Sequence, residues 1–446
     1  MLRIASAKSA AWALTAQGLA AEGVGFAGSG RGLVSFEWSA ERAKSCAAPQ
    51  KRHLLMSDIT STVAPAPLRR TALHATHQAH KARMVDFGGW DMPVQYRGLI
   101  EEHMAVRTGV GVFDVSHMGD IQLRGPNSLA AVQKLLMNDA SRLQIGQAHY
   151  SAMLYPNGTF VDDVVLHKLG ENDYLIVINA GTREKDVQWV RKTIGGMSGL
   201  HITDVSDYYT QIAIQGPKAQ ATLQKLTGVD LAPIKNYWFT WGQVCGLHNV
   251  LIARTGYTGE DGFEIYVPAD EATSARVWAE VLAAGEEFGI MPCGLGARNT
   301  LRLESAMALY GHEISDTLNV FEANLGRYCK MDKGVDFVGR EALLEVQNGG
   351  GPTKRLVGLE MVERGIGRDG YPVFSLQGER IGEITSGSPG PFVKKNIALA
   401  YVPMSFVEAG TEVAIEIRGQ MVKAVVVPTP FYKRAKAAAV VTAPLS

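Results

Sequence analysis

Two adjacent aspartates, Asp162 and Asp163, lie inside an apolar, β-branched run between Phe160 and Leu166. Neighbouring side chains of a strand point to opposite faces, so at least one of these carboxylates is expected to face an interior or a cleft. Burying a carboxylate costs several kcal/mol, on the order of the penalty for a buried charge, unless it has a partner or a task. Held in such a place, it can act as an acid, a base or a stabiliser of developing positive charge.

A β-hairpin is expected to carry this pair. The turn signal is Pro156-Asn-Gly158, because Asn and Gly tolerate positive φ at low cost. The flanks, residues 149–154 and 159–167, are apolar and β-prone, as strands are. Alternation alone does not decide which aspartate faces the cleft, and an ion-paired or turn-supporting carboxylate remains the ordinary alternative for either.

The composition limits what such a site could act on. The chain has 446 residues, enough for two or three domains, and its 44 basic and 44 acidic side chains cancel. Without a net charge no field favours nucleic acid or an anionic membrane, and no apolar run reaches the roughly 18–20 residues of a membrane-spanning helix. The four cysteines lack the spacing of a zinc site or a disulfide framework, so a reducing compartment is expected.

One sequence pattern occurs twice and predicts an internal duplication. Around Gly125 and again around Gly216, an apolar strand leads to Gly-Pro and then to a helix containing Gln-Lys-Leu. Chance is the alternative for so short a match. From about Gly350 the pattern changes to short strands separated by Gly, Pro and Ser, which is typical of a small barrel or sandwich.

Three histidines, His74, His77 and His80, follow one another at a spacing of three. They could form a metal-binding face, but the segment 75–83 is polar almost throughout. This pattern favours a solvated helix or loop, and no metal site is predicted.

Six motifs stand out along the chain: Phe113-Asp-Val-Ser-His-Met118, Val161-Asp-Asp163, Gly256-Tyr-Thr-Gly-Glu-Asp-Gly-Phe-Glu264, Gly294-Leu-Gly-Ala-Arg298, Ala308-Leu-Tyr-Gly311 and Pro430-Phe-Tyr-Lys-Arg434. Together they resemble the aminomethyltransferase, or T-protein, family of the glycine cleavage system. The third motif is fairly specific to the wider folate-dependent family, and its combination with the first and the last narrows the resemblance to T-proteins. The resemblance runs from about Leu68 to Arg434.

The resemblance implies a monomeric α+β chain of three domains, packed like a clover leaf around a central tetrahydrofolate pocket. Two related α+β domains are expected. The first would comprise residues 68–119 and 206–310 and bind folate, and the second, residues 120–205, would carry the catalytic aspartate. Residues 311–446 would form a linker and a C-terminal all-β, barrel-like domain.

The reaction that the resemblance implies moves the aminomethyl carbon from the lipoyl arm of the H-protein to tetrahydrofolate. Its products are ammonia, 5,10-methylenetetrahydrofolate and the dihydrolipoyl H-protein. Lipoylated H-protein is therefore the expected partner and tetrahydrofolate the expected acceptor, without a metal.

The key aspartate of the family matches Asp163, which leaves Asp162 as a structural neighbour. Apolar neighbours such as Val161 and Val165 would desolvate the Asp163 carboxyl and raise its pKa toward a useful range. Glu264 matches the family's pterin-binding glutamate, and a carboxylate suits the adjacent N–H and NH₂ groups of the pterin edge.

Arg298 matches the family's folate-contacting arginine, which could bind the folate carboxylate or hold the acids of the site. Positions that line the folate pocket in the family match Met118, Tyr150, Asn179 and Tyr257. An aromatic ring and a thioether offer flat, adaptable contacts to the folate rings. Tyr432, or Arg434 beside it, is expected to close the pocket from the C-terminal domain. Taken singly, each of these residues would be interpreted as an ion pair or as core.

Two other functions remain open. A related folate-dependent demethylase would take its carbon from a sarcosine-like or sulfonium substrate, although the flavin-linked forms need a dinucleotide fingerprint that is absent here. A non-enzymatic folate-binding factor for iron–sulfur assembly is marked by Lys-Gly-Cys-Tyr-x-Gly-Gln-Glu, and the region after Gly326 lacks that motif.

The N-terminal stretch, residues 1–67, is expected to be a disordered leader. Up to Glu22 it is rich in Ala, with Arg3 and Lys8 and no acid, which loosely resembles a mitochondrial transit peptide. The preferred interpretation is an extension ahead of a true start at Met56, with a cytoplasmic location in a bacterium. The mitochondrial matrix is the alternative.

Overall fold

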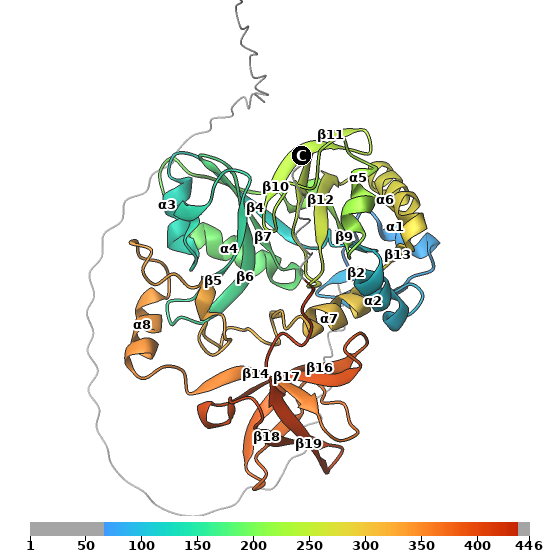
Figure 1. Cartoon of the computed structure of the whole chain (residues 1–446). Coiled ribbons are helices and arrows are strands. Elements are labelled where there is room, and N and C mark those ends of the chain that lie inside the picture. The colour runs from blue at the N-terminus through green and yellow to red at the C-terminus, as the bar shows by residue number, and fades with distance from the viewer. Residues whose placement is uncertain (1–66, 436–446) are drawn as a thin grey trace, which may run out of the picture. The chain divides into compact units, whose positions relative to one another are not determined.

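The computed structural model describes residues 67–435, so the proposed start at Met56 and nearly all of the predicted leader lie outside the described residues. Three main sheets organise this part of the chain: one of five strands, one of six, and a closed barrel (Figure 1). The predicted α+β class with a C-terminal barrel is confirmed. None of the helices within residues 67–435 is long and apolar enough to cross a membrane.

The five-stranded sheet contains the predicted hairpin. Strands β5 and β6 pair antiparallel with Asp163 opposite Ala152, and Gly158 in the turn has φ +79°. Helices α3 (Ser128–Leu135) and α4 (Arg183–Ile194) cover one face, where their apolar side chains join those of the strands in one core. In spatial order the strands are β5 (Ala148–Leu154), β6 (Phe160–Gly170), β7 (Asp173–Ile178), β4 (Gly119–Arg124) and β8 (His201–Asp204).

The six-stranded sheet has helices on both faces. On one face α5 (Ala219–Gln224) and α6 (Glu271–Gly285) build a core around the fully buried Trp278. On the other, α2 (Leu99–Thr108) and α7 (Leu295–Glu304) pack against β3 and β9. In spatial order the strands are β10 (Phe239–Val244), β11 (Leu247–Ala253), β12 (Gly262–Pro268), β9 (Tyr209–Gln215), β3 (Gly111–Asp114) and β13 (Met291–Pro292).

The two sheets also meet each other. Leu175 and Val205 from the five-stranded sheet and its flank share one apolar cluster with Phe239, Leu251 and Tyr266 from the six-stranded sheet. Side chains at this seam can therefore come from either sheet and still face one common space.

The predicted duplication recurs in the backbone. Strands β4 and β9 end directly before Gly125 and Gly216, whose φ values of +125° and +130° suit glycine, and a helix follows each. An Asp-Val-Ser turn precedes each strand. The Ser116 amide donates to Asp114 Oδ1 at 2.9 Å, and the Ser206 amide donates to Asp204 Oδ1 at 3.1 Å.

The two copies exchange strands. β3 precedes β4 along the chain but pairs with β9, while β8 precedes β9 and pairs with β4. Each sheet thus contains a strand from the other copy, so neither sheet is complete without both copies.

The barrel closes without a free edge, which removes the unpaired backbone groups of an open sheet. Its interior is filled by apolar side chains such as Leu359, Ile384 and Ile415. Helix α8 (Arg340–Asn348) precedes it. In spatial order its strands are β14 (Lys354–Met361), β17 (Lys395–Pro403), β16 (Arg380–Gly390), β15 (Pro372–Phe374), β18 (Glu412–Ile417) and β19 (Gln420–Val427).

The prediction of a solvated histidine segment is wrong for two of its three histidines. His74 and His77, in the short helix α1 (His74–Ala79), are both buried. His77 Nε2 lies 2.8 Å from Asp114 Oδ2, and His74 Nε2 lies 2.7 Å from Asp91 in the β1–β2 hairpin (Arg83–Phe87 and Trp90–Gln95). These partners are distant in sequence, so local polarity could not reveal them.

The buried Arg302 pairs with a carboxylate and also joins α7 to the barrel through a hydrogen bond. Arg302 Nη1 donates to Glu313 Oε2 at 2.7 Å, and its Nη2 donates to Ser386 on β16, also at 2.7 Å. The Arg302 and Glu313 side chains are 1% and 0% exposed, so neither charge has water as an alternative partner.

Replacing Arg302 with Met is expected to destabilise the protein by about 3–5 kcal/mol, because Glu313 keeps a buried charge without its partner. Urea unfolding followed by circular dichroism measures the loss. The matched control is Arg380→Met, whose ion pair with Glu383 is exposed on the same strand and is worth at most about 1 kcal/mol. Equal, small losses for both variants would contradict the role given to Arg302.

Candidate functional site

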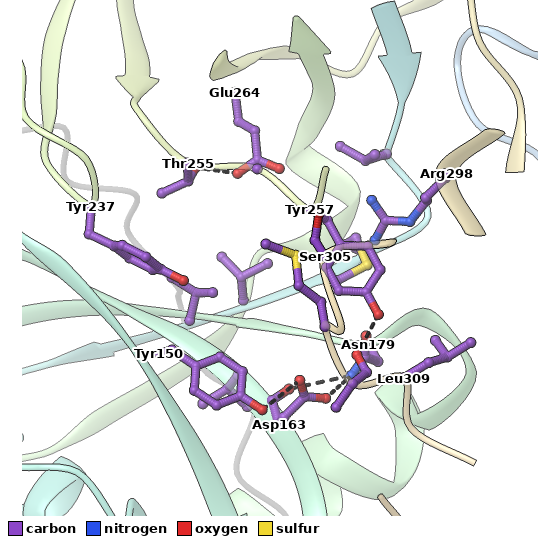
Figure 2. A pocket seen from close by; sticks show the side chains of 18 of the residues that line it. Tyr150, Asp163, Asn179, Tyr237, Thr255, Tyr257, Glu264, Arg298, Ser305 and Leu309 are labelled. Atoms are coloured by element: carbon purple, nitrogen blue, oxygen red, sulfur yellow. Dashed lines mark hydrogen bonds between the residues drawn. The ribbon is translucent and has the colours of Figure 1, made fainter. Parts of the chain in front are cut away.

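A cavity of about 260 Å³ lies at the seam between the two sheets (Figure 2). Strands β5, β6 and β7 line one side of it, and β9 and β12 line the other. The segments 305–309 and 325–328, which belong to neither sheet, complete the wall. Most of the lining is aromatic or aliphatic, and a few polar groups face inward, as in sites for small molecules.

Asp163 faces this cavity from β6, whereas Asp162 beside it is fully buried on the opposite face. The Tyr150 hydroxyl donates to Asp163 Oδ2 at 3.1 Å, and Asn179 Nδ2 donates to Oδ1 at 2.8 Å. The two donors fix the plane of the carboxyl, and its remaining edge is open to the cavity.

The surroundings of Asp163 favour its neutral form. Burial raises its pKa, and the charge of the neighbouring Asp162 raises it further. The hydrogen bonds from Asn179 and Tyr150 oppose part of this rise, and the resulting pKa is about 7. The upward shift expected from apolar neighbours is therefore present, and the group can gain or lose a proton near neutral pH.

Glu264 faces the cavity from β12, on the six-stranded sheet (Figure 2). Thr255 donates its hydroxyl hydrogen to Glu264 Oε2. Burial raises the pKa of this carboxyl, while the Thr255 hydrogen bond and the charge of Arg298 oppose the rise. No ion-pair partner within 4 Å is found for Glu264 among residues 67–435, so a carboxylate edge is left for a ligand that carries hydrogen-bond donors.

Arg298 projects from the first turns of α7, with its guanidinium carbon 4.5 Å from the centre of the Tyr257 ring. Its guanidinium has no hydrogen bond or ion pair to another residue of the described chain. Burial lowers its pKa, although nearby Tyr257 and Glu264 raise it. A guanidinium placed this way can bind an anionic or carbonyl group of a ligand.

The structure brings together seven of the eight predicted site residues. The residues that line the cavity are Met118, Tyr150, Asp163, Asn179, Tyr257, Glu264 and Arg298. Tyr432 is the exception, because it lies outside the lining. Its ring packs under the Arg107 guanidinium, 3.9 Å from the centroid, and edge-on against Phe392.

Several lining residues were not predicted. Tyr237 and Tyr328 add aromatic walls, and the Tyr328 ring lies 4.8 Å from that of Tyr150. His167, at the end of the second strand of the predicted hairpin, is buried, and burial lowers its pKa to about 4. Only His167 carried a signal, since it lies an even number of residues from Asp163 and so shares its strand face.

These groups suit a flat ligand with a polar edge and a reacting centre that gains positive charge. Asp163 can accept or position a proton, and its charge can stabilise a cation formed next to it. Glu264 and Arg298 offer complementary charges for the polar edge of a flat ligand, and the aromatic walls offer stacking.

Comparison with known families agrees with this arrangement. The model of the GCVT N-terminal domain matches residues 73–333, and that of the glycine cleavage T-protein C-terminal barrel domain matches residues 354–433. The first match includes every lining residue of the cavity, and the second spans the closed barrel.

Relatives in sequence and in structure point the same way. The chain is 70% identical over 376 residues to an aminomethyltransferase of Acidobacterium capsulatum, covering 84% of this chain and 99% of the relative. It is 63% identical over 374 residues to that of Koribacter versatilis, covering 83% and 98%. The crystal structure of the glycine cleavage system aminomethyltransferase T from Bartonella henselae superposes with a TM-score of 0.76 at 32% identity, over 82% of this chain and 98% of that one. The chain belongs to the aminomethyltransferase family of the glycine cleavage system.

Proposed function

We propose that this enzyme transfers the aminomethyl carbon from the lipoyl arm of the H-protein to tetrahydrofolate, with Asp163 as its acid–base and electrostatic group. One observation carries the proposal: Asp163, Glu264 and Arg298 come from three distant elements and face one cavity with flat, apolar walls. The family assignment supplies the reaction class, the family resemblance supplies the residue roles, and the shared cavity supports them.

The folate would lie between the two sheets. The Glu264 carboxylate suits the adjacent N–H and NH₂ of the pterin, which it can bind through two hydrogen bonds. The rings of Tyr150, Tyr237 and Tyr257 would contact the flat parts of the folate. Arg298 would hold a carbonyl or carboxylate oxygen of the ligand.

The reaction exchanges two bonds to one carbon. The folate N5 forms a bond to the methylene carbon as ammonia leaves, and N10 then forms a second bond as the lipoyl thiolate leaves. The two hydrogens lost from N5 and N10 end on ammonia and on the thiol, so the step needs no oxidant. The carboxylate of Asp163 would stabilise the positive charge that develops on the carbon and its nitrogen, and it would take up and return the proton.

We also propose a location and a state of assembly. Both sequence relatives named above come from bacteria, which favours the bacterial cytoplasm over the mitochondrial matrix. The expected partner is lipoylated H-protein, and the expected state of the enzyme alone is a monomer.

Replacing Asp163 with Asn should lower the rate of tetrahydrofolate-dependent ammonia release by roughly 10²–10⁴-fold, the usual cost of a lost acid–base group. The amide keeps the shape of the side chain, so folate affinity should change little. The assay supplies aminomethyl-lipoyl H-protein and follows ammonia, and Asp316→Asn, an exposed carboxylate elsewhere, is the control. A variant that runs at full speed would remove Asp163 from the mechanism.

The rate should also depend on pH through Asp163. Because its pKa is raised to about 7, ionised carboxylate is lost as the pH falls below 7, so kcat should decline on the acid side and level off above. The pH–rate profile of the single-turnover step measures this limb. A rate that does not change between roughly pH 5.5 and 8.5 would contradict titration of the Asp163 carboxyl in the reaction.

Replacing Glu264 with Gln should weaken tetrahydrofolate binding by about 10–100-fold, since charge-assisted hydrogen bonds are worth about 1.5–3 kcal/mol. At saturating folate the rate should fall far less, because Glu264 lies on the opposite side of the cavity from Asp163. Equilibrium fluorescence titration gives the dissociation constant. Glu271→Gln on the exposed start of α6 is the matched control, and unchanged affinity in Glu264→Gln would refute the pterin assignment.

A further inference from the structure

A second carboxyl lies directly behind the site. Asp186, on α4, has a fully buried side chain, and neither of its oxygens has a hydrogen-bond partner among the described residues. An ionised carboxylate in such a place would have no compensation for the water it has lost. The residue plays no part in the reaction outlined above, so its burial needs its own explanation.

The nearest cation does not neutralise Asp186. Lys185 Nζ lies 4.0 Å from Asp186 Oδ1, but its hydrogens go to the Val161 carbonyl and, at 2.8 Å, to the Tyr310 hydroxyl. The hydroxyl of Thr182 is close to both carboxyls and donates to Asp162 Oδ2 at 2.9 Å. Asp186 therefore receives no donor from its own helix or from the segment that follows α7.

Besides burial, the charge of Asp162 and a hydrogen bond with Asp162 both raise the pKa of Asp186, so the two carboxyls are neighbours. Asp162 already accepts three hydrogen bonds. They come from the Asn179 amide at 3.0 Å, from Asn179 Nδ2 at 2.9 Å, and from Thr182. Two carboxyls in contact at a buried position cannot both be ionised, so one proton is held between them. Asp162 accepts three hydrogen bonds, and no donor to Asp186 is found within residues 67–435, which puts the proton on Asp186. Burial, and then the charge of Asp162, raise the pKa of Asp186.

We propose that Asp186 is a neutral acid that donates its proton to Asp162, and that this carboxylic acid–carboxylate pair is a positioning element for Asp163. Asp162 of this pair holds Asn179 in place by accepting hydrogen bonds from the backbone and side-chain amides of Asn179. Asn179 Nδ2 in turn donates one hydrogen to Asp162 and the other to Asp163 Oδ1 at 2.8 Å. The protonation of Asp186 follows from its burial and from the missing donors at both of its oxygens, whereas its effect on catalysis rests on the proposed function.

The pair also sets the charge next to Asp163. The single negative charge of the pair is on Asp162, and this charge helps to raise the pKa of Asp163. From the other elements that surround Asp163, the hydroxyls of Tyr150, Tyr237 and Tyr257 and the guanidinium of Arg298 face the same space. Glu264 is a further carboxylate of the cavity, but it lies on the opposite side, so Asp162 is the adjacent anion whose removal should lower the pKa of Asp163.

The pH dependence of the melting temperature tests whether Asp186 is protonated, and it needs no assay of activity. The folded pKa of Asp186 lies above its unfolded value, so its contribution is complete at acid pH and is lost progressively as the pH rises. Asp186→Asn removes this loss and still donates an N–H to Asp162. The variant should therefore melt at a higher temperature than the wild type, with a gain that grows between about pH 5 and pH 9.

Asp316→Asn is the matched control, because Asp316 is an exposed carboxylate that also acts on Tyr310. It should show no gain that grows with pH. If Asp186→Asn instead melts lower than the wild type at every pH, or gains equally at every pH, Asp186 is not a neutral acid and the proposal fails.

The pH–rate profile tests the positioning role. Asp162→Asn removes the negative charge next to Asp163, and the neutral Asp186 does not replace it. The acid limb of kcat should then shift to lower pH by on the order of one unit, while folate affinity stays within a few-fold. In Asp186→Asn the charge stays on Asp162, so the limb should not move and most of the rate should be retained.

The outcomes separate this proposal from the proposed function. A limb that stays in place in Asp162→Asn would show that the pair is structural only and would overturn the positioning role. A wild-type protein without tetrahydrofolate-dependent ammonia release would overturn the proposed function, and the melting experiment would still decide the protonation of Asp186.

Discussion

One amide nitrogen, Nδ2 of Asn179, donates to two carboxylates, and the geometry of the site depends on it. Adjacent aspartates on a strand point to opposite faces, so a group that contacts both carboxyls must lie beside the strand. Asn179, at the end of β7, reaches both groups because β6 and β7 are paired neighbours. The buried face then supplies a fixed charge on Asp162, and the open face presents Asp163 with one donor already in place. The strand register therefore determines both the direction and the electrostatics of the reactive carboxyl.

The exchange of strands between the two copies explains how the other half of the cavity is held in place. β3 and β8 each complete the sheet of the opposite copy, so Asp163 on one sheet and Glu264 on the other cannot separate without breaking strand pairing. The apolar cluster shared by Leu175 and Phe239 closes the same seam. A pocket that must hold a flat ligand between two sheets benefits from this rigidity, because less ordering is left for the ligand to impose.

Local patterns predicted the parts of this structure that local physics determines. The turn at Gly158, the Gly-Pro starts of two helices and the short strands of the barrel follow from residue conformational preference and from alternation. The choice of Asp163 over Asp162 needed the family resemblance, since periodicity treats the two alike. His77 was misjudged because its partner, Asp114, is on another element, and burial of a polar residue is visible only with its partner. Tyr237 and Tyr328 were missed because aromatic residues outside a motif look the same whether they line a core or a cavity.

The charged groups of the cavity show how its surroundings act on a ligand. Burial raises the pKa of Asp163 and of Glu264 and lowers that of Arg298, so each group is held in an environment that disfavours its charge. A ligand that brings N–H donors to Glu264 and an acceptor to Arg298 relieves this cost on binding. At Asp163 the relief comes only when positive charge develops on the reacting carbon. At the Glu264 and Arg298 end of the cavity, desolvation therefore contributes to ligand affinity. At the Asp163 end it contributes to the reaction rate, because the positive charge near Asp163 is stronger in the transition state than in the bound substrate.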